Sequence, residues 1–161
     1  MKPWKYYKDI FSIDYLTLIQ ENKNVLLFDL DNTIINNRVK DVTDKEIALF
    51  RDLDKKGFRV FIVSNSFPWR VKKICNRLSI MGFGLACKPF TFNVSKIMKK
   101  YKMNKENTVI IGDQIYTDVV CADKLSIKSI LVDPIDIYES FITMFNRGRE
   151  NDIINRGDYY E

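Results

Sequence analysis

The chain has 161 residues and a net charge of +5, and its 46% hydrophobic and 29% charged residues are typical of one globular domain. It contains no histidine, which excludes a Ser-His-Asp triad, a histidine general base and a His-ligated zinc site. The three cysteines are too few and too scattered for a disulfide framework or a CxxC metal site. We therefore expect any catalysis to depend on carboxylates, hydroxyls, lysines and a hard metal ion.

Two features of the sequence indicate where in the cell the protein is expected. Residues 1–14 lack the apolar core of a signal peptide. Residues 78–87 form a stretch without a charge that is as long as any in the chain, yet shorter than the roughly 20 residues that span a bilayer. These features predict a cytoplasmic protein, either free or peripheral on the inner face of the membrane.

Four short apolar runs, each ending in polar residues, predict buried parallel strands at residues 24–29, 59–64, 108–112 and 129–133. Between the first two runs, Thr43 to Glu46 is a capping-box pattern that begins a helix, and Gly57 is placed to end it. Further helices are predicted at residues 69–78, 94–101 and 117–125. The alternation predicts an α/β fold, a Rossmann-like parallel sheet with helices on both faces, in a single domain over residues 1–161.

Polar fragments mark the carboxyl ends of such strands, where ligands of parallel sheets lie. They are Asp29-Leu-Asp-Asn-Thr33 after the first strand, Ser64-Asn65 after the second, then Lys88-Pro89, and Gly112-Asp-Gln114 with Thr117-Asp118. Each fragment alone is a weak signal, because an Asp after a strand often only caps a turn or helix. Their order and placement predict that they converge on one functional site.

The ordered set DxDxT, Ser-Asn, Lys and GDQxxTD resembles the haloacid dehalogenase (HAD) superfamily of aspartate-nucleophile phosphatases, over about residues 24–133. Residues 28–33 and 112–118, and Thr143 with Asn146-Arg147, resemble the bacterial YqeG group, which is similar to the mitochondrial phosphatidylglycerophosphate phosphatases. The resemblance implies a HAD-like fold and hydrolysis of phosphomonoesters through an aspartyl-phosphate. It favours dephosphorylation of phosphatidylglycerophosphate to phosphatidylglycerol.

A carboxylate can attack a phosphate dianion only if positive charge surrounds the phosphate, and Mg²⁺ suits that task. By the resemblance, Asp29 is metal ligand and nucleophile. Asp31 lends its backbone carbonyl to the metal, and its carboxyl acts as general acid and then general base. The other implied roles are Asp113 as metal ligand, Asp118 as further ligand or anchor, Ser64 and the backbone N–H of Asn65 as phosphate binders, and Lys88 as the charge that neutralises the phosphate and Asp29.

Three other polar residues of the motifs have no assigned step. The hydroxyl of Thr33 either acts in the site or only braces the loop, and the two readings are equally supported. Asn32 and Gln114 are expected to line the site.

The motif spacing bears on the substrate. Only 28 residues separate Asp31 from Val60 and only 22 separate Asn65 from Lys88, and predicted helices occupy most of both gaps. Neither gap has room for a cap domain, so we expect an open site that takes a large or membrane-embedded phosphate ester, or a lid from a partner subunit in an oligomer. Six lysines and no acidic residue between Cys87 and Lys105 suit an anionic substrate, anionic lipid or nucleic acid, or form an ordinary solvated helix face.

Aromatic and apolar residues recur near both ends of the chain. Trp4, Tyr6, Tyr7 and Phe11 lie among lysines, and residues 137–145 repeat apolar side chains at helical spacing. Such stripes either contact an anionic membrane or pack on the core, and packing is the more common outcome.

Three functions remain open from the sequence. The first is a phosphatidylglycerophosphate phosphatase, and the second is a capless phosphatase of another large substrate, such as a phosphoprotein or a nucleic-acid 3′-phosphate. The third is a non-catalytic binding module on the same fold. Because every acidic position of the motifs is filled, the third is the least favoured. Nucleic acid is not the expected partner, although the second function leaves it open.

Overall fold

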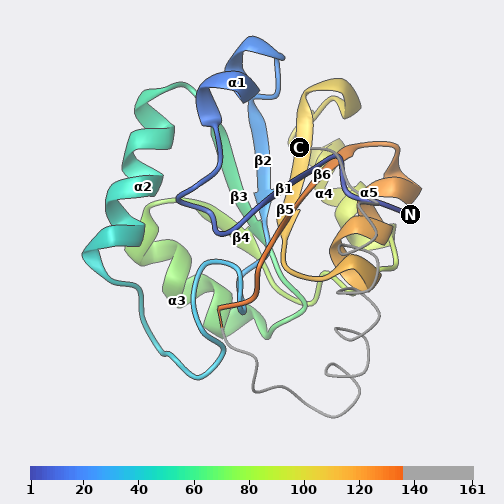
Figure 1. Ribbon diagram of the computed structural model, residues 1–161. Coiled ribbons are helices and arrows are strands. Elements are labelled where there is room, and N and C mark those ends of the chain that lie inside the picture. Colours follow the sequence, from blue (N-terminus) through green and yellow to red (C-terminus); the bar gives the residue numbers. More distant parts are fainter. Residues whose placement is uncertain (136–161) are drawn as a thin grey trace.

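A computed structural model of the chain describes residues 1–135, which form one six-stranded parallel sheet in the order β1-β6-β5-β2-β3-β4 (Figure 1). The strands are β1 (Lys5–Tyr7), β2 (Val25–Phe28), β3 (Arg59–Val63), β4 (Met81–Phe83), β5 (Thr108–Gly112) and β6 (Lys128–Val132). The central strand β2 pairs with β5 on one side and β3 on the other. This order brings the carboxyl ends of the three strands that precede the motifs side by side.

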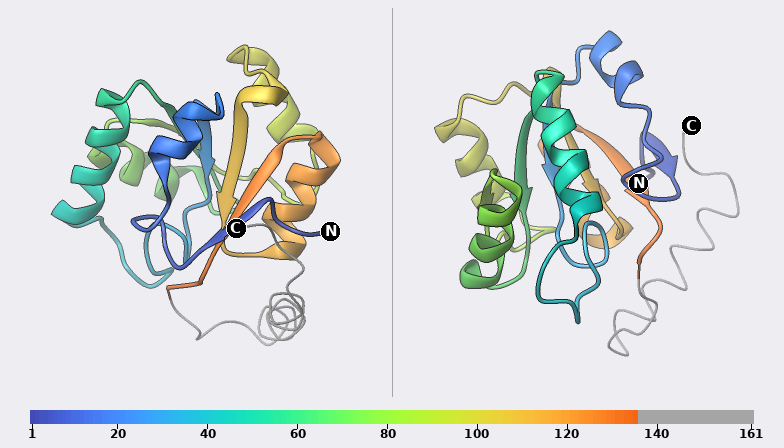
Figure 2. Two further views of the ribbon diagram at one scale, coloured as in Figure 1. Left: turned by 45° about the horizontal axis from the view of Figure 1, so that its top comes forward. Right: turned by 90° about the vertical axis from the view of Figure 1, so that its left-hand side faces the viewer.

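Helices cover both faces of the sheet (Figure 2). They are α1 (Tyr15–Gln20), α2 (Asp44–Lys55), α3 (Pro68–Leu78), α4 (Phe92–Lys100) and α5 (Val120–Leu125), with a π-helical turn at Ile115–Val119 leading into α5. Side chains of β2 alternate between the two cores. Leu26 and Phe28 pack with α1, α2 and α3, whereas Val25 and Leu27 pack with α4 and α5.

The predicted signals at the ends of α2 are confirmed. The backbone N–H of Thr43 donates to the Glu46 carboxylate at 3.0 Å, as a capping box requires. Gly57 follows the helix with φ +87°, a left-handed conformation that glycine adopts without strain. The local sequence therefore sets both ends of this helix.

The α/β class and the four predicted strands are confirmed, and three short elements were missed. The edge strands β1 and β4 have three residues each and α1 has six, too few to show a hydrophobic period. The helix predicted at residues 117–125 begins two residues earlier, with the π-helical turn. Lys88 lies in a loop beyond β4 and not directly at a strand end.

The aromatic residues of the N-terminal segment pack against the protein. Trp4, Tyr7 and Phe11 are half-buried on the main core cluster, and Tyr6 packs beside Leu131. The apolar residues 137–145, and Thr143, Asn146 and Arg147, lie outside the described residues.

No cap domain is present within residues 1–135. The connection from β2 to β3 holds one loop and α2, and the connection from β3 to β5 holds α3, β4 and α4. In the same part of the chain, no helix has both the length and the apolar character needed to cross a bilayer. The site at the carboxyl end of the sheet is therefore not covered by a second domain of the described chain.

Candidate active site

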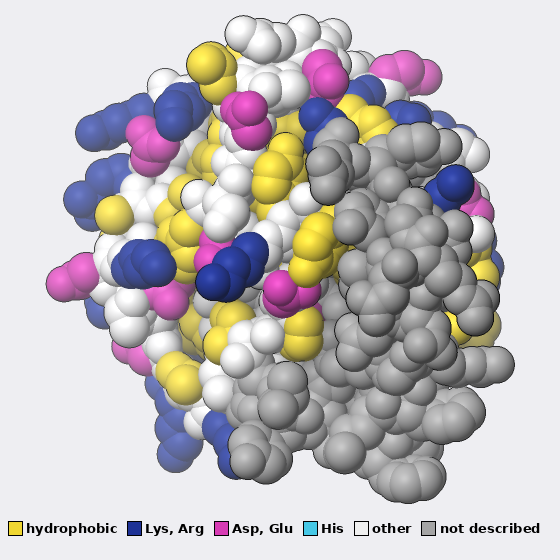
Figure 3. All heavy atoms as spheres, in the orientation of Figure 1, with side chains coloured by type: hydrophobic (Ala, Val, Ile, Leu, Met, Phe, Trp, Pro, Cys, Tyr) yellow, Lys and Arg dark blue, Asp and Glu magenta, His cyan; other side chains and the backbone are white. Residues whose placement is uncertain are grey.

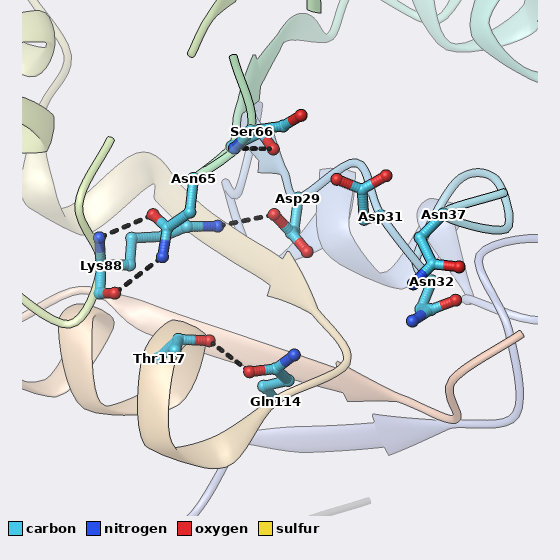
Figure 4. A pocket seen from close by; sticks show the side chains of 10 residues that line it. Asp29, Asp31, Asn32, Asn37, Asn65, Ser66, Lys88, Gln114 and Thr117 are labelled. Atoms are coloured by element: carbon cyan, nitrogen blue, oxygen red, sulfur yellow. Dashed lines mark hydrogen bonds and ion pairs between the residues drawn. The ribbon is translucent and has the colours of Figure 1, made fainter. Parts of the chain in front are cut away.

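The polar fragments converge on one pocket of about 390 Å³ at the carboxyl ends of the strands (Figure 4). Of the residues expected from the sequence, those that line it are Asp29, Asp31, Asn32, Ser64, Asn65, Lys88, Gln114 and Thr117, and the lining also includes Asn37 and Ser66. The backbone N–H of Asp29 donates to the Ile111 carbonyl at 2.8 Å, which extends the β2–β5 pairing by one residue and holds Asp29 at the pocket floor.

Three carboxylates gather at this floor. Oxygen atoms of Asp29, Asp113 and Asp118 all lie within 4.8 Å of one another. Asp113 and Asp118 are buried, and the Asp29 side chain is 13% exposed toward the pocket. The trio brings together the two carboxylates expected as metal ligands, Asp29 and Asp113, and that of Asp118, which was expected as a further ligand or anchor.

Lys88 supplies the positive charge beside these carboxylates. Its Nζ lies 2.9 Å from Asp29 Oδ1 and 2.7 Å from Asp118 Oδ1, and its side chain is buried. Asn65 holds the Lys88 backbone in place, since its side chain accepts from the Lys88 N–H and donates to the Lys88 carbonyl, both at 2.8 Å. Figure 4 shows Asn65 alongside Lys88, with the Lys88 side chain directed at Asp29. The Asn65 side chain thus positions Lys88, a contact that sequence reasoning had missed.

The electrostatic balance of the floor favours a cation. Burial raises the pKa of Asp29 to about 6, an effect that Lys88 opposes and the Asp113 carboxylate reinforces. Burial also raises the pKa of Asp118, again against the pull of Lys88. For Lys88, burial lowers the pKa, but Asp118 and Asp29 outweigh it and raise the pKa above its ordinary value. Asp29 and Asp118 therefore share the ammonium group of Lys88, with the Asp113 carboxylate nearby.

This donor set fits a hard divalent cation. All three side chains offer carboxylate oxygens, the ligands that Mg²⁺ prefers. Their oxygen atoms lie within 4.8 Å of one another, a spread similar to the roughly 4.1 Å between opposite ligands of Mg²⁺. A divalent charge would also offset the excess of negative charge at the floor.

The place of Asp118 depends on Gly112 and on the π-helical turn. A Cβ at Gly112 would lie 2.2 Å from Asp118 Cγ, so only glycine lets this carboxylate pack over the end of β5. The backbone N–H of Gln114 donates to Asp118 Oδ2 at 3.2 Å. Gly112, the glycine of the GDQ fragment, therefore belongs to the site because any larger side chain would displace the Asp118 carboxylate.

Thr33 braces the Asp113 carboxylate at the floor. Its buried hydroxyl donates to Asp113 Oδ1 at 3.0 Å. Ser64, also buried, lines the pocket and accepts from the Ser66 N–H at 3.0 Å through its Oγ. Thr117 donates to the side-chain oxygen of Gln114 at 3.3 Å, which orients that amide at the pocket wall.

Asp31 has a partner that sequence reasoning missed. Arg70, in the first turn of α3, donates to Asp31 Oδ1 from Nη2 at 2.7 Å and from Nε at 3.2 Å. Its Nη1 donates to the Val39 carbonyl at 3.0 Å, in the loop that carries Asn37. In Figure 4, Asp31 lies on the side of Asp29 away from Lys88. Arg70 therefore holds Asp31 apart from the trio.

Comparisons with known proteins agree with this arrangement. A model of the HAD-hydrolase-like family matches residues 85–134. The chain is 33% identical over 153 residues to the probable phosphatase YqeG of Bacillus subtilis (strain 168), a match that covers 95% of this chain and 89% of that protein.

Two solved structures share the fold. The cobalt-bound deoxy-D-mannose-octulosonate 8-phosphate phosphatase of Haemophilus influenzae matches with a TM-score of 0.55 and 15% identity, over 71% of this chain and 80% of that one. A putative 3-deoxy-D-manno-octulosonate 8-phosphate phosphatase from Vibrio cholerae matches with a TM-score of 0.58 and 16% identity, over 81% of this chain and 79% of that one.

Proposed function

The chain belongs to the HAD superfamily of phosphatases, as a relative of the YqeG phosphatase, and on this premise we propose that it hydrolyses phosphomonoesters through an aspartyl-phosphate formed on Asp29. This membership confirms the resemblance predicted from the motifs, and it favours an enzyme over a non-catalytic binding module. The observation that carries the proposal is the convergence of Asp29, Asp113 and Asp118 with Lys88 at the floor of an open pocket.

We assign the metal to the same floor. Asp29, Asp113 and the backbone carbonyl of Asp31 would hold Mg²⁺, with Asp118 as a further ligand or as the anchor that keeps Lys88 in place. When bound, the ion would offset the negative charge of the phosphate and of the nucleophile. The fold neighbour from Haemophilus influenzae is a cobalt-bound form, which supports a divalent ion in this class of site.

The chain's own residues would then carry the two chemical steps. An oxygen of Asp29 attacks phosphorus and the bond to the leaving oxygen breaks, while the carboxyl of Asp31 gives that oxygen a proton. Water next attacks the phosphorus of the aspartyl-phosphate, Asp31 accepts the proton from water, and the bond to Asp29 breaks. Ser64 and the backbone N–H of Asn65 bind phosphate oxygens, and Lys88 neutralises charge.

Arg70 is assigned to position Asp31 for proton donation. Arg70→Gln should lower kcat/KM for an alkyl ester such as glycerol phosphate by about 10- to 100-fold, because an alkoxide needs the proton of a well-placed acid. Nitrophenolate leaves without a proton, so kcat/KM for p-nitrophenyl phosphate should change by less than about threefold. The ratio kcat/KM reports only steps up to departure of the leaving group, and so it excludes hydrolysis of the aspartyl-phosphate.

Arg77→Gln is the matched control for this prediction. Arg77 also lies on α3 and reaches the same loop, where its Nε lies 3.3 Å from Asp41 Oδ1, but it does not contact Asp31. The Arg77→Gln variant should keep the wild-type kcat/KM for both glycerol phosphate and p-nitrophenyl phosphate. An equal loss on both esters for Arg70→Gln would mean that Arg70 acts through the loop or the fold and not through Asp31.

For the physiological substrate we propose phosphatidylglycerophosphate. The pocket has no cap within residues 1–135, so a headgroup held at a lipid surface can reach Asp29. In mixed micelles this lipid should be hydrolysed with a kcat/KM at least about tenfold above that for glycerol phosphate, because its remote parts add binding energy. A preference for a phosphopeptide or an oligonucleotide 3′-phosphate in the same panel would replace the lipid, and the exposed lysines 96–105 would then be the contact to examine.

A further inference from the structure

Large apolar side chains are exposed in the two loops that border the pocket and in the first turns of α3 and α4, which follow those loops. We name Phe67, Trp69, Leu85, Phe90 and Phe92 the mouth patch; each is at least 49% exposed. Phe67 follows directly after Ser66, which lines the pocket, and Phe90 stands two residues after Lys88. Single exposed apolar residues are normal, but several gathered beside a pocket mark a surface that binds something.

Backbone and side-chain contacts join the two loops into one surface. The backbone N–H of Leu85 donates to the Ser66 carbonyl at 2.8 Å, and Gly84 is so close to Pro68 that a Cβ there would lie 2.6 Å from its nitrogen. On the other side, the Asn93 amide donates to the Leu85 carbonyl at 2.8 Å. The mouth patch is therefore held together by the same loops that hold Ser64, Asn65 and Lys88.

The chain around the patch is uniformly basic. Between Asp54 and Glu106 it has 13 of the 26 basic residues and none of the 21 acidic ones, so this part carries +13 and the rest −8. Lys72, Lys73 and Lys96 are exposed in the first two turns of α3 and α4, which begin at the mouth, and Lys124 Nζ lies 6.0 Å from the Phe90 ring. Elsewhere the charges are mixed: Figure 3 shows acidic side chains among the basic ones along the left-hand edge.

We infer that the mouth patch is the surface by which the protein docks on an anionic bilayer. Phe and Trp side chains enter the interfacial region of a membrane, and neighbouring lysines remain at the level of the lipid phosphates. Docking in this orientation sets the opening of the pocket against the headgroup layer. The inference rests on the proposed lipid substrate, and it places the membrane contact in the loops after β3 and β4, since the N-terminal aromatic residues pack on the core.

The test measures binding of the full chain to vesicles. Phosphatidylcholine vesicles with and without phosphatidylglycerol are sedimented with the wild type, with Trp69→Gln/Phe92→Gln and with Leu16→Gln. Leu16 is 63% exposed on α1, at the opposite end of the sheet, and so is an equally exposed apolar control. We expect the wild type and Leu16→Gln to bind anionic vesicles alike, and the double variant to bind at least about tenfold more weakly.

A second measurement reports on the patch itself. Trp69 is 70% exposed, and its fluorescence should shift to the blue when anionic vesicles are added. Binding should weaken with salt through the lysines and keep a salt-resistant part through the apolar side chains. Equal binding of the double variant and the wild type, or no wild-type binding at low salt, overturns the inference.

Hydrolysis of p-nitrophenyl phosphate separates failure of the docking surface from failure of the proposed activity. The double variant should keep wild-type activity on this soluble ester and lose activity only on phosphatidylglycerophosphate in vesicles. If the wild type hydrolyses the soluble ester and does not bind vesicles, the docking inference fails and the phosphatase activity stands. If the mouth patch instead alters turnover of a phosphopeptide with no vesicle binding, the surface takes a protein and the membrane assignment is wrong.

Discussion

Replacement of Asp29 by asparagine should lower kcat by at least about 10³-fold and leave the fold intact, because the amide has nearly the same shape but cannot attack phosphorus. Lys88 keeps its ion pair with Asp118 at 2.7 Å in this variant, so its buried ammonium retains a partner. Because burial raises the pKa of Asp29 to about 6, its charge opposes folding at pH 7. In chelator, the variant should therefore unfold at the same temperature as the wild type or at a higher one.

The measurements are kcat on p-nitrophenyl phosphate and the thermal unfolding midpoint. Asp52→Asn is the matched control, since Asp52 is an exposed aspartate on α2 that pairs with Lys56 and lies outside the pocket lining. It should leave kcat unchanged. Retention of more than a few per cent of activity by Asp29→Asn would remove Asp29 as the nucleophile.

Removal of divalent cations should reduce activity at least about 10³-fold, and Mg²⁺ should restore it. The floor gathers the carboxylate oxygens of Asp29, Asp113 and Asp118 within 4.8 Å of one another, so a bound cation would offset the repulsion among them. Ca²⁺ should restore less activity, because its larger size and looser coordination would displace the nucleophile.

The same assignment predicts a stability change that does not depend on turnover. Mg²⁺ should raise the unfolding temperature of the wild type, because a ligand that binds only the folded state stabilises it. Asp113→Asn should shrink that shift, whereas Asp52→Asn should not. Full activity in chelator, or an unfolding temperature that Mg²⁺ leaves unchanged, would contradict the metal site.

Local sequence determined the elements of this protein and the order of its motifs. The apolar runs of β2, β3, β5 and β6 are buried strands because their side chains have no polar face to expose. Thr43 and Gly57 set the ends of α2 through contacts within a few residues. Since parallel strands end at one edge of the sheet, placing Asp29, Ser64 and Asp113 after such strands was enough to predict that they meet.

Contacts between distant residues were decided only by the tertiary structure. Lys88 contacts Asp29 across 59 positions of the sequence, a pairing that only the family resemblance implied, and Arg70 contacts Asp31 across 39, which no sequence pattern indicated. The Asp118 carboxylate joins the trio because Gly112 has no Cβ and the π-helical turn starts before it. A sequence motif indicates which residue types the reaction needs. Which carboxylate oxygens gather at the floor, and which arginine contacts Asp31, depends on side-chain packing that is settled only when the strands are in register.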